Sequence, residues 1–269
     1  MDRKKFNRIV RNPRHISGIH NYCDRWCERC PFTLRCSVAA MGAEVDEERE
    51  PHDRKDEELW GRLEGVRAVA RELLEKHADH AGVPVAKEPM LKRRKKLSAD
   101  DSDPGFREVD TDPLGSAMKR YMEFAHAFVK QQQEILPETA PTAAVDVSPA
   151  EAFEVIHFYH TMILVKGARA LSRDEFDEQM EEDLAEDEDP NARFQTDQNG
   201  TAKVVLICID RTILAWTALM QHVPAMTEAA LSCMLTLDRL RRGLEKRFPD
   251  TGKFVRPGFD TVKFPERKG

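Results

Sequence analysis

The 269-residue sequence has no run of about 18 apolar residues, which is the length that a membrane-spanning helix needs. No apolar stretch follows the basic first residues either, so the pattern of a secretory signal peptide is missing. We therefore expect a cytoplasmic protein with no membrane partner. Thiols stay reduced in the cytoplasm, and clustered cysteines there are more often metal ligands than disulfide partners.

Sequence motifs for nucleotide binding and for covalent catalysis are also missing. The chain has no glycine-rich phosphate loop, no dinucleotide fingerprint and no residue that stands out as a catalytic nucleophile. Alternation of apolar and polar residues, which indicates strands, does not occur convincingly, and no internal repeat is present. The sequence therefore indicates neither a reaction nor a substrate.

Charged residues make up 33% of the chain and apolar residues 41%, so much of the protein must be solvated helix surface or loop. The net charge of −6 is small, but the charges are segregated. Residues 1–36 hold nine Lys or Arg against three Asp or Glu, and a second basic run spans Lys92–Lys96. Residues 174–189 hold eleven carboxylates and no basic residue. The basic start is the part of the chain through which nucleic acid would be contacted.

Apolar residues recur at three- and four-residue spacing through much of the chain, which predicts an all-α fold. Helix 201–222 is apolar nearly all round, which marks it as the buried centre of a four-helix-type bundle with long charged loops. The other bundle helices are expected at 114–136, 149–171 and 224–248. We divide the chain into a four-cysteine metal-binding segment (1–45), an amphipathic helix (53–82), a charged linker (83–113), the helical bundle (114–248) and a C-terminal tail (249–269).

Four of the six cysteines fall within fourteen residues, at Cys23, Cys27, Cys30 and Cys36. Four soft ligands this close together predict one metal site, which is either a [4Fe–4S] cluster or a single Zn²⁺ ion. If residues 23–30 form a helix, the first three sulfurs share one stripe of it. The chain then folds the fourth cysteine back after the helix ends.

The cysteine spacing favours the iron–sulfur cluster over zinc. Structural zinc sites usually come as two short C-x2-C pairs separated by a longer loop, and this segment has a single such pair. His15 and His20 flank the cysteines, and we interpret them as surface residues; the alternative is that either histidine replaces a cysteine ligand or donates a hydrogen bond to one. The other two cysteines, Cys208 and Cys233, lie within apolar helices and are expected to be packed thiols.

Two E-x-x-H motifs, Glu123–His126 and Glu154–His157, lie on neighbouring predicted helices. Di-iron bundles use this motif on two helices together with a carboxylate from each of two others. At about 100° per residue, however, these side chains mostly point away from the apolar faces of their helices. We therefore interpret them as surface residues, and a di-metal bundle oxidoreductase is kept only as an alternative. The carboxylates that would complete such a site are Asp210 and either Glu228 or Asp238.

Three charged residues interrupt apolar runs in the predicted bundle. Lys166 lies on the apolar face of helix 149–171, and Asp210 and Arg211 interrupt helix 201–222. A buried charge is costly unless it is paired, so we expect a Lys166–Asp210 or an Arg211–Asp238 ion pair between helices. A polar pocket for a small ligand is the functional alternative.

These features predict a metalloprotein whose N-terminal cysteines serve a redox, sensing or structural role, with a protein partner that the sequence does not identify. A zinc-stabilised nucleic-acid-binding protein is the main alternative. It rests on the basic residues of 1–36, on the run Lys92–Lys96 and on the aromatic residues Tyr22, Trp26 and Phe32. The negative net charge and the acidic stretch count against it.

Overall fold

The computed structural model describes residues 3–44, 57–77, 111–132, 147–172, 189 and 191–261. Within these ranges the regular elements are helices and there is no strand, so the all-α prediction is confirmed there. Several sequence features lie outside the described residues. They are the charged linker up to residue 110 with its basic run Lys92–Lys96, the acidic stretch up to residue 188, and the tail from residue 262.

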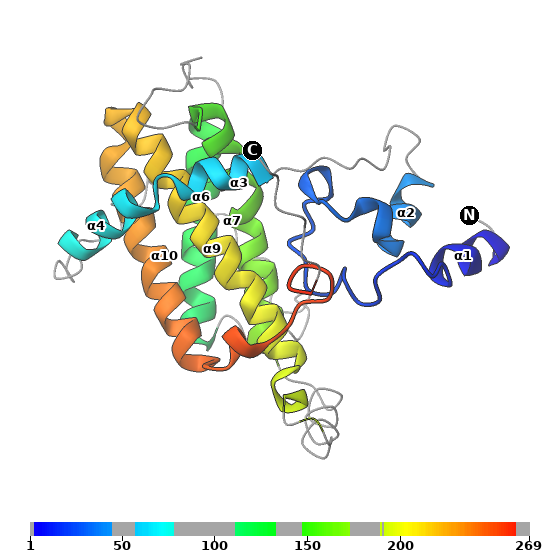
Figure 1. Cartoon of the computed structure of the whole chain (residues 1–269). Helices are drawn as coiled ribbons and strands as arrows, with labels where there is room; N and C mark the ends of the chain where they lie inside the picture. The colour runs from blue at the N-terminus through cyan, green and yellow to red at the C-terminus, as the bar shows by residue number, and fades with distance from the viewer. Residues whose placement is uncertain are drawn as a thin grey trace, which may run out of the picture.

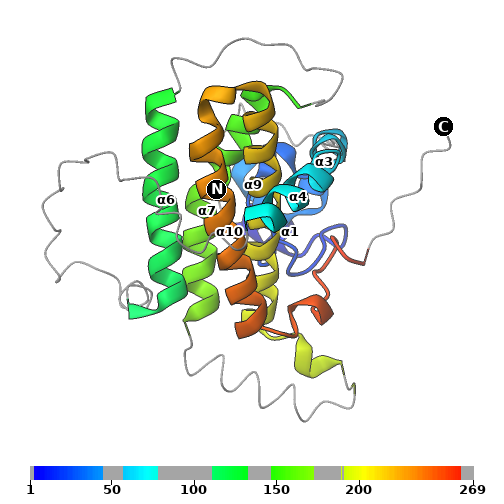
Figure 2. The same cartoon turned by 90° about the vertical axis from the view of Figure 1, so that its left-hand side faces the viewer.

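Four long helices pack around one core: α6 (Pro113–Gln132), α7 (Pro149–Leu171), α9 (Asp197–His222) and α10 (Thr227–Arg247). Each of them packs against two others, in the cyclic order α6, α7, α9, α10. Successive helices run in opposite directions along the bundle (Figures 1 and 2). Apolar stripes of four antiparallel helices are thereby buried against one another.

Helix α9 is the centre of the core. Its residues from Thr212 to Met220 are all buried, and the indole Nε1 of Trp216 donates a 3.2 Å hydrogen bond to Oη of Tyr121 in α6. By length and composition, α9 is also the one helix among the described residues that is long and apolar enough to cross a membrane. Because 72% of its most apolar window is buried inside the protein, packing in the core accounts for that composition.

Capping residues set the starts of α7 and α9. Ser148 Oγ accepts the N–H of Glu151 (3.2 Å), and the Glu151 carboxylate accepts the N–H of Ser148 (2.9 Å), which completes a capping box. Helix α9 begins at Asp197, earlier than the predicted residue 201, because Thr196 Oγ1 accepts the N–H of Asn199. That first turn is polar, so apolar periodicity does not reveal it.

The single helix expected at 53–82 is two helices in the structure, α3 (Glu57–Glu64) and α4 (Arg67–His77). The break falls at Gly65, whose N–H donates to the carbonyl of Arg62 in a tight turn (3.1 Å). A Cβ at this position would lie 3.0 Å from the carbonyl oxygen of Arg62, so glycine suits the tight turn, and its low helix propensity favours the break. The change of direction lets α3 and α4 cross the bundle over α9 and α10 (Figure 1).

Residues 3–44 form an N-terminal arm that lies beside the bundle (Figure 1). The arm contains two α-helices, α1 (Arg3–Val10) and α2 (Ser37–Ala43), which pack on each other. Between them lie two three-ten turns, η1 (Cys27–Arg29) and η2 (Thr33–Arg35). The apolar pattern does not predict α1, because Ile9 is its single buried residue.

The described part of the tail joins the bundle to the arm. Phe254 packs edge-on against Tyr22 of the arm with ring centroids 4.6 Å apart, and Phe259 does the same against Phe32 at 4.9 Å. The tail therefore contacts the cysteine segment as well as the bundle. The remaining three-ten turns are η3 (Ala192–Phe194), η4 (Pro224–Met226) and η5 (Thr251–Lys253).

Candidate metal centre

The four cysteines of the arm, Cys23, Cys27, Cys30 and Cys36, line one cavity together with His20. All four are half-buried, and none of them forms a disulfide. The cavity volume of about 20 Å³ is close to that of one water molecule. Within the described ranges, no three His, Cys, Asp or Glu side chains already converge as ligands of one ion.

A turn, and not a helix, carries the first two cysteines. Arg25 has a φ of 64°, a left-handed conformation that cannot belong to a right-handed helix. Asp24 favours the turn, because its Oδ1 accepts the backbone N–H of Trp26 (3.2 Å). The predicted stripe of sulfurs on a helix over 23–30 is therefore wrong, and only Cys27–Arg29 forms a short three-ten turn. Strained backbone of this kind is concentrated at functional sites.

Backbone N–H groups face two of the sulfurs. Phe32 donates its N–H to Sγ of Cys30 (3.4 Å), and the backbone of Arg25 makes the same kind of bond to Cys23. Such bonds stabilise a thiolate and tune the metal that it binds. For the free thiols burial outweighs them, since it raises the pKa of Cys30 to about 12 and the pKa of Cys23 above its ordinary value. Metal binding would therefore release protons from these cysteines.

Of the two flanking histidines, His20 lies at the cavity, whereas His15 donates from Nδ1 to the carbonyl of Ile9 outside it (2.9 Å). The Nδ1 atom of His20 is buried and has no hydrogen-bond partner among the described residues. An unpaired buried nitrogen costs roughly 1–3 kcal/mol, which makes this atom a candidate ligand. Burial lowers the pKa of His20, and the charges of Arg25 and Lys166 act in the same direction. The neutral ring is the form that binds a metal.

Asp24 joins the cysteine turn to the bundle. Its Oδ2 accepts hydrogen bonds from Oη of Tyr159 and from Nη1 of Arg211, both at 2.7 Å. The Arg211 guanidinium also lies 3.7 Å from the ring centroid of Trp60, where it makes a cation–π contact. The predicted Arg211–Asp238 pair is therefore not formed, because Arg211 faces the arm. Asp238 pairs instead with two arginines of its own helix.

Trp26 is the main apolar anchor of the cysteine segment. Its side chain is 5% exposed and stacks on Phe158 of α7 with ring centroids 4.2 Å apart. Trp60 and Tyr159 pack edge-on against the same indole, at 5.9 and 5.4 Å. Burial of an indole removes a large apolar area from water, so this contact holds the turn against the bundle.

Two polar contacts lie beside this anchor. Arg29 of the arm pairs with Glu154 of α7, and Nζ of Lys166 donates to the carbonyl of Asn21 (3.1 Å). The predicted Lys166–Asp210 pair is therefore not formed. The positive charge of Lys166 also lowers the pKa of Cys23, against the larger effect of burial, and so favours the thiolate.

The two E-x-x-H motifs lie on the surface of the bundle, as their helical phase predicts. Glu123, His126, Glu154 and His157 are all exposed. Glu154 is paired with the arm, and no carboxylate of these motifs faces the bundle core. These positions do not support the di-metal alternative.

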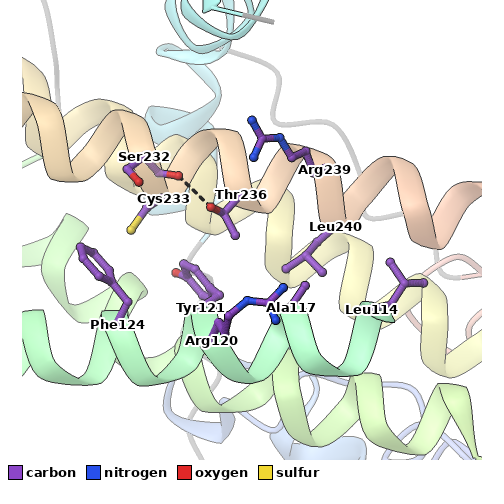
Figure 3. A pocket seen from close by; sticks show the side chains of 10 residues that line it. All are labelled: Leu114, Ala117, Arg120, Tyr121, Phe124, Ser232, Cys233, Thr236, Arg239 and Leu240. Carbon is purple, nitrogen blue, oxygen red and sulfur yellow. Dashed lines mark hydrogen bonds between the residues drawn. The ribbon is translucent and has the colours of Figure 1, made fainter. Parts of the chain in front are cut away.

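Two larger cavities lie among the bundle helices. The one in Figure 3 lies between α6 and α10, and Tyr121 and Cys233 project into its mostly apolar interior. The other, of about 390 Å³, lies between α4, α9 and α10 and contains Asp210 beside Arg67 and Arg241. Burial raises the pKa of Asp210, although the two arginines act in the opposite direction. This second cavity is where a polar ligand pocket of the expected kind would lie.

No family model, curated protein or solved structure matches the chain. The chemistry of the cysteine cavity therefore rests on its own residues. The sequence pattern identifies the cysteines but misses the docking roles of Asp24, Trp26 and Arg211. The one signal for those roles is the charge of Arg211 within an apolar helix, because a buried charge requires a partner from elsewhere in the chain.

Proposed function

We propose that the protein is a metalloprotein in which Cys23, Cys27, Cys30 and Cys36 bind a [4Fe–4S] cluster or a Zn²⁺ ion. The observation that carries this proposal is the single cavity that the four cysteines share with His20. The cluster is favoured over zinc because the segment has only one C-x2-C pair. The cysteine spacing is the argument between the two, and metal analysis has to separate them.

The arm supplies the candidate metal ligands and also packs against the bundle. Three residues interleaved with the cysteines, Asp24, Trp26 and Arg29, contact the bundle. When bound, a cluster supplies a one-electron redox centre, and zinc supplies a structural crosslink. Because the same turn carries ligands and docking residues, a change at the thiols changes how firmly the arm is held. This link between the state of the thiols and the docking of the arm supports a sensing or structural role. In a sensing role, the bundle would respond to the change at the cysteines.

Metal and sulfide analysis of protein purified without oxygen tests the proposal. A cluster gives about four irons and about four sulfides per chain. The protein is then brown and absorbs at about 400 nm. Zinc gives about one ion per chain and a colourless protein. A protein with neither metal in stoichiometric amount contradicts the proposal.

Serine substitutions show whether the cavity is the site. Replacing Cys27 and Cys30 together removes two thiolates and should abolish stoichiometric metal. The matched control is Cys208→Ala, which removes a fully buried thiol in α9 and should leave the metal content unchanged. Equal metal content in the two variants would place the metal elsewhere in the protein.

A zinc-stabilised nucleic-acid-binding protein is the second candidate, and α1 is the observation that favours it. Arg3, Lys4 and Arg8 are exposed on this helix, which lies away from the bundle (Figure 1). Exposed cations on one helix attract a phosphate backbone. The aromatic residues of the segment do not support this function, because Trp26 and Phe32 are buried within the protein.

Binding to a labelled duplex over a range of salt concentrations tests the second candidate. Phosphate contacts predict an affinity that falls steeply with salt, and Arg8→Gln should reduce the slope of log affinity against log salt by about 1. The control Lys253→Gln alters an exposed lysine of the tail, which pairs with Asp250. No binding at low salt rules out this function.

A further inference from the structure

A pair of histidines joins α6 to α7 on the surface of the bundle. Nδ1 of His126 lies 3.3 Å from Nε2 of His160, and the two rings are stacked with centroids 5.5 Å apart. His126 is exposed, whereas His160 is 2% exposed. Nε2 of the buried His160 ring and Nδ1 of the exposed His126 ring therefore face each other.

The backbone fixes which nitrogen of His160 is able to bind a ligand. Its Nδ1 lies 2.5 Å from the carbonyl oxygen of His157, which only accepts hydrogen bonds, so Nδ1 carries the proton. In the neutral ring this leaves a lone pair on Nε2. Metal-binding histidines have this same arrangement, with one ring nitrogen donating to a backbone carbonyl and the other binding the ion.

The distance between the two nitrogens matches a metal site. Two nitrogens bound at about 2.05 Å to one tetrahedral ion are about 3.3 Å apart. We propose that His126 and His160 bind one divalent transition-metal ion, of the zinc, nickel or copper type, at the junction of α6 and α7. Imidazole nitrogen is a ligand that these ions share.

A third imidazole lies beside the pair, but within the described ranges no three His, Cys, Asp or Glu side chains already converge on one ion. The centroid of the His157 ring lies 5.7 Å from that of the His160 ring, and the His157 side chain is exposed, so it would have to turn toward the pair to become a third ligand. Water completes the coordination. This site holds one ion between two helices at the surface, unlike the di-metal arrangement, which needs inward-facing carboxylates from four helices. The histidine site uses no residue of the cysteine cavity, so the proposal does not depend on the proposed function.

Titration of the full chain with Ni²⁺, followed by NMR of the histidine rings, tests the proposal. Paramagnetic Ni²⁺ should broaden the ring signals of His126 and His160 at less than one ion per chain, before those of His77. The variant His126→Gln should weaken Ni²⁺ binding at this site at least about tenfold. Because His126 is exposed, this variant is expected to keep the fold, which thermal unfolding followed by circular dichroism checks.

The matched control is His77→Gln on α4, where Nδ1 donates to the carbonyl of Leu73 in the same helix (2.8 Å). It should leave Ni²⁺ binding unchanged. Broadening that stays confined to the arm after more than one Ni²⁺ ion per chain has been added would mean that the cysteines take the ion and would overturn the histidine site. Equal Ni²⁺ affinity of wild type and His126→Gln would overturn it too, and would leave the pair as a hydrogen bond that satisfies a buried ring.

Discussion

Oδ2 of Asp24 lies 2.7 Å from Nη1 of Arg211, although 187 residues separate the two in the sequence. The carboxylate belongs to the turn that carries the first two cysteines, and the guanidinium belongs to the central helix α9. Both side chains are mostly removed from solvent, with 18% and 27% exposed. A pair this poorly hydrated is sensitive to the loss of one partner, because the other charge is then left without compensation.

Replacing Asp24 with Asn should loosen the arm. The substitution keeps the side-chain shape but removes the charge that faces Arg211, and it should lower the free energy of unfolding by roughly 1–3 kcal/mol. Urea denaturation measures this change. Asp250→Asn is the control, since it breaks an exposed pair with Lys253 and should cost about 0.5 kcal/mol or less. An equal decrease in the free energy of unfolding in both variants would mean that the Asp24–Arg211 pair stabilises the protein no more than an exposed ion pair does.

Removing the metal should release the arm from the bundle. Trp26 and Trp60 both lie in the docking contact, so their exposure to water should shift the tryptophan emission to longer wavelength on chelation. Saturating metal at about 1,000 times its Kd stabilises the bound fold by about 4 kcal/mol, so the melting temperature should fall as well. The variant Trp26→Phe should lose most of the emission shift. Unchanged emission after complete metal removal would show that docking is independent of the cysteines.

Replacing Gly200 with Ala should disturb the junction of arm, tail and α9. A Cβ atom there would lie 2.5 Å from ring atoms of Tyr22 and of Phe254, which is closer than van der Waals contact allows. Repacking of the two rings should lower the free energy of unfolding by roughly 1–3 kcal/mol. The control is Gly61→Ala in α3, where a Cβ meets nothing within 4 Å. Better helix propensity should stabilise that control by up to about 1 kcal/mol, and chemical denaturation compares the two.

Glu151 should make the protein sensitive to acid. Burial pushes the pKa of Glu151 upward, but hydrogen bonds from Arg62 and Ser148 outweigh burial and hold the pKa at about 2. A folded-state pKa below the unfolded one contributes stability that is complete above about pH 4.3 and is lost as the pH falls towards 2. Glu151→Gln should therefore flatten the loss of stability between about pH 4.3 and about pH 2. It should also cost up to about 1 kcal/mol at pH 7 through the lost ion pair with Arg62, because a Gln side chain still completes the capping box.

Urea denaturation at a series of pH values measures the effect. Glu228→Gln, an exposed carboxylate in the first turn of α10, serves as the control and should keep the wild-type pH profile. An unchanged profile in Glu151→Gln would mean that other carboxylates dominate acid unfolding. Asp260 is the next candidate, because hydrogen bonds from Arg256 and Lys203 outweigh its burial and hold its pKa at about 2.

Local sequence patterns predict the long helices well and the arm poorly. Helix α7 follows its expected bounds, because Ser148, Pro149 and Glu151 specify its first turn and an apolar stripe continues from there. The cysteine segment has no such repeat. Its conformation depends on an Asp24 side chain that bonds to the Trp26 N–H and on an indole that is buried against another helix. The first contact is local but follows no helical repeat, and the second is long-range, so apolar periodicity within one segment reports neither.

The sequence by itself determined the helical class, the buried centre of the bundle and the set of four cysteines, because spacing of residue types along the chain encodes all three. The tertiary structure decided which charges meet. Lys166 and Arg211 both turn toward the arm, to Asn21 and Asp24, rather than toward the carboxylates expected within the bundle. The physical reason is that a half-buried charge takes whichever partner the packing brings close, and only the fold sets that distance.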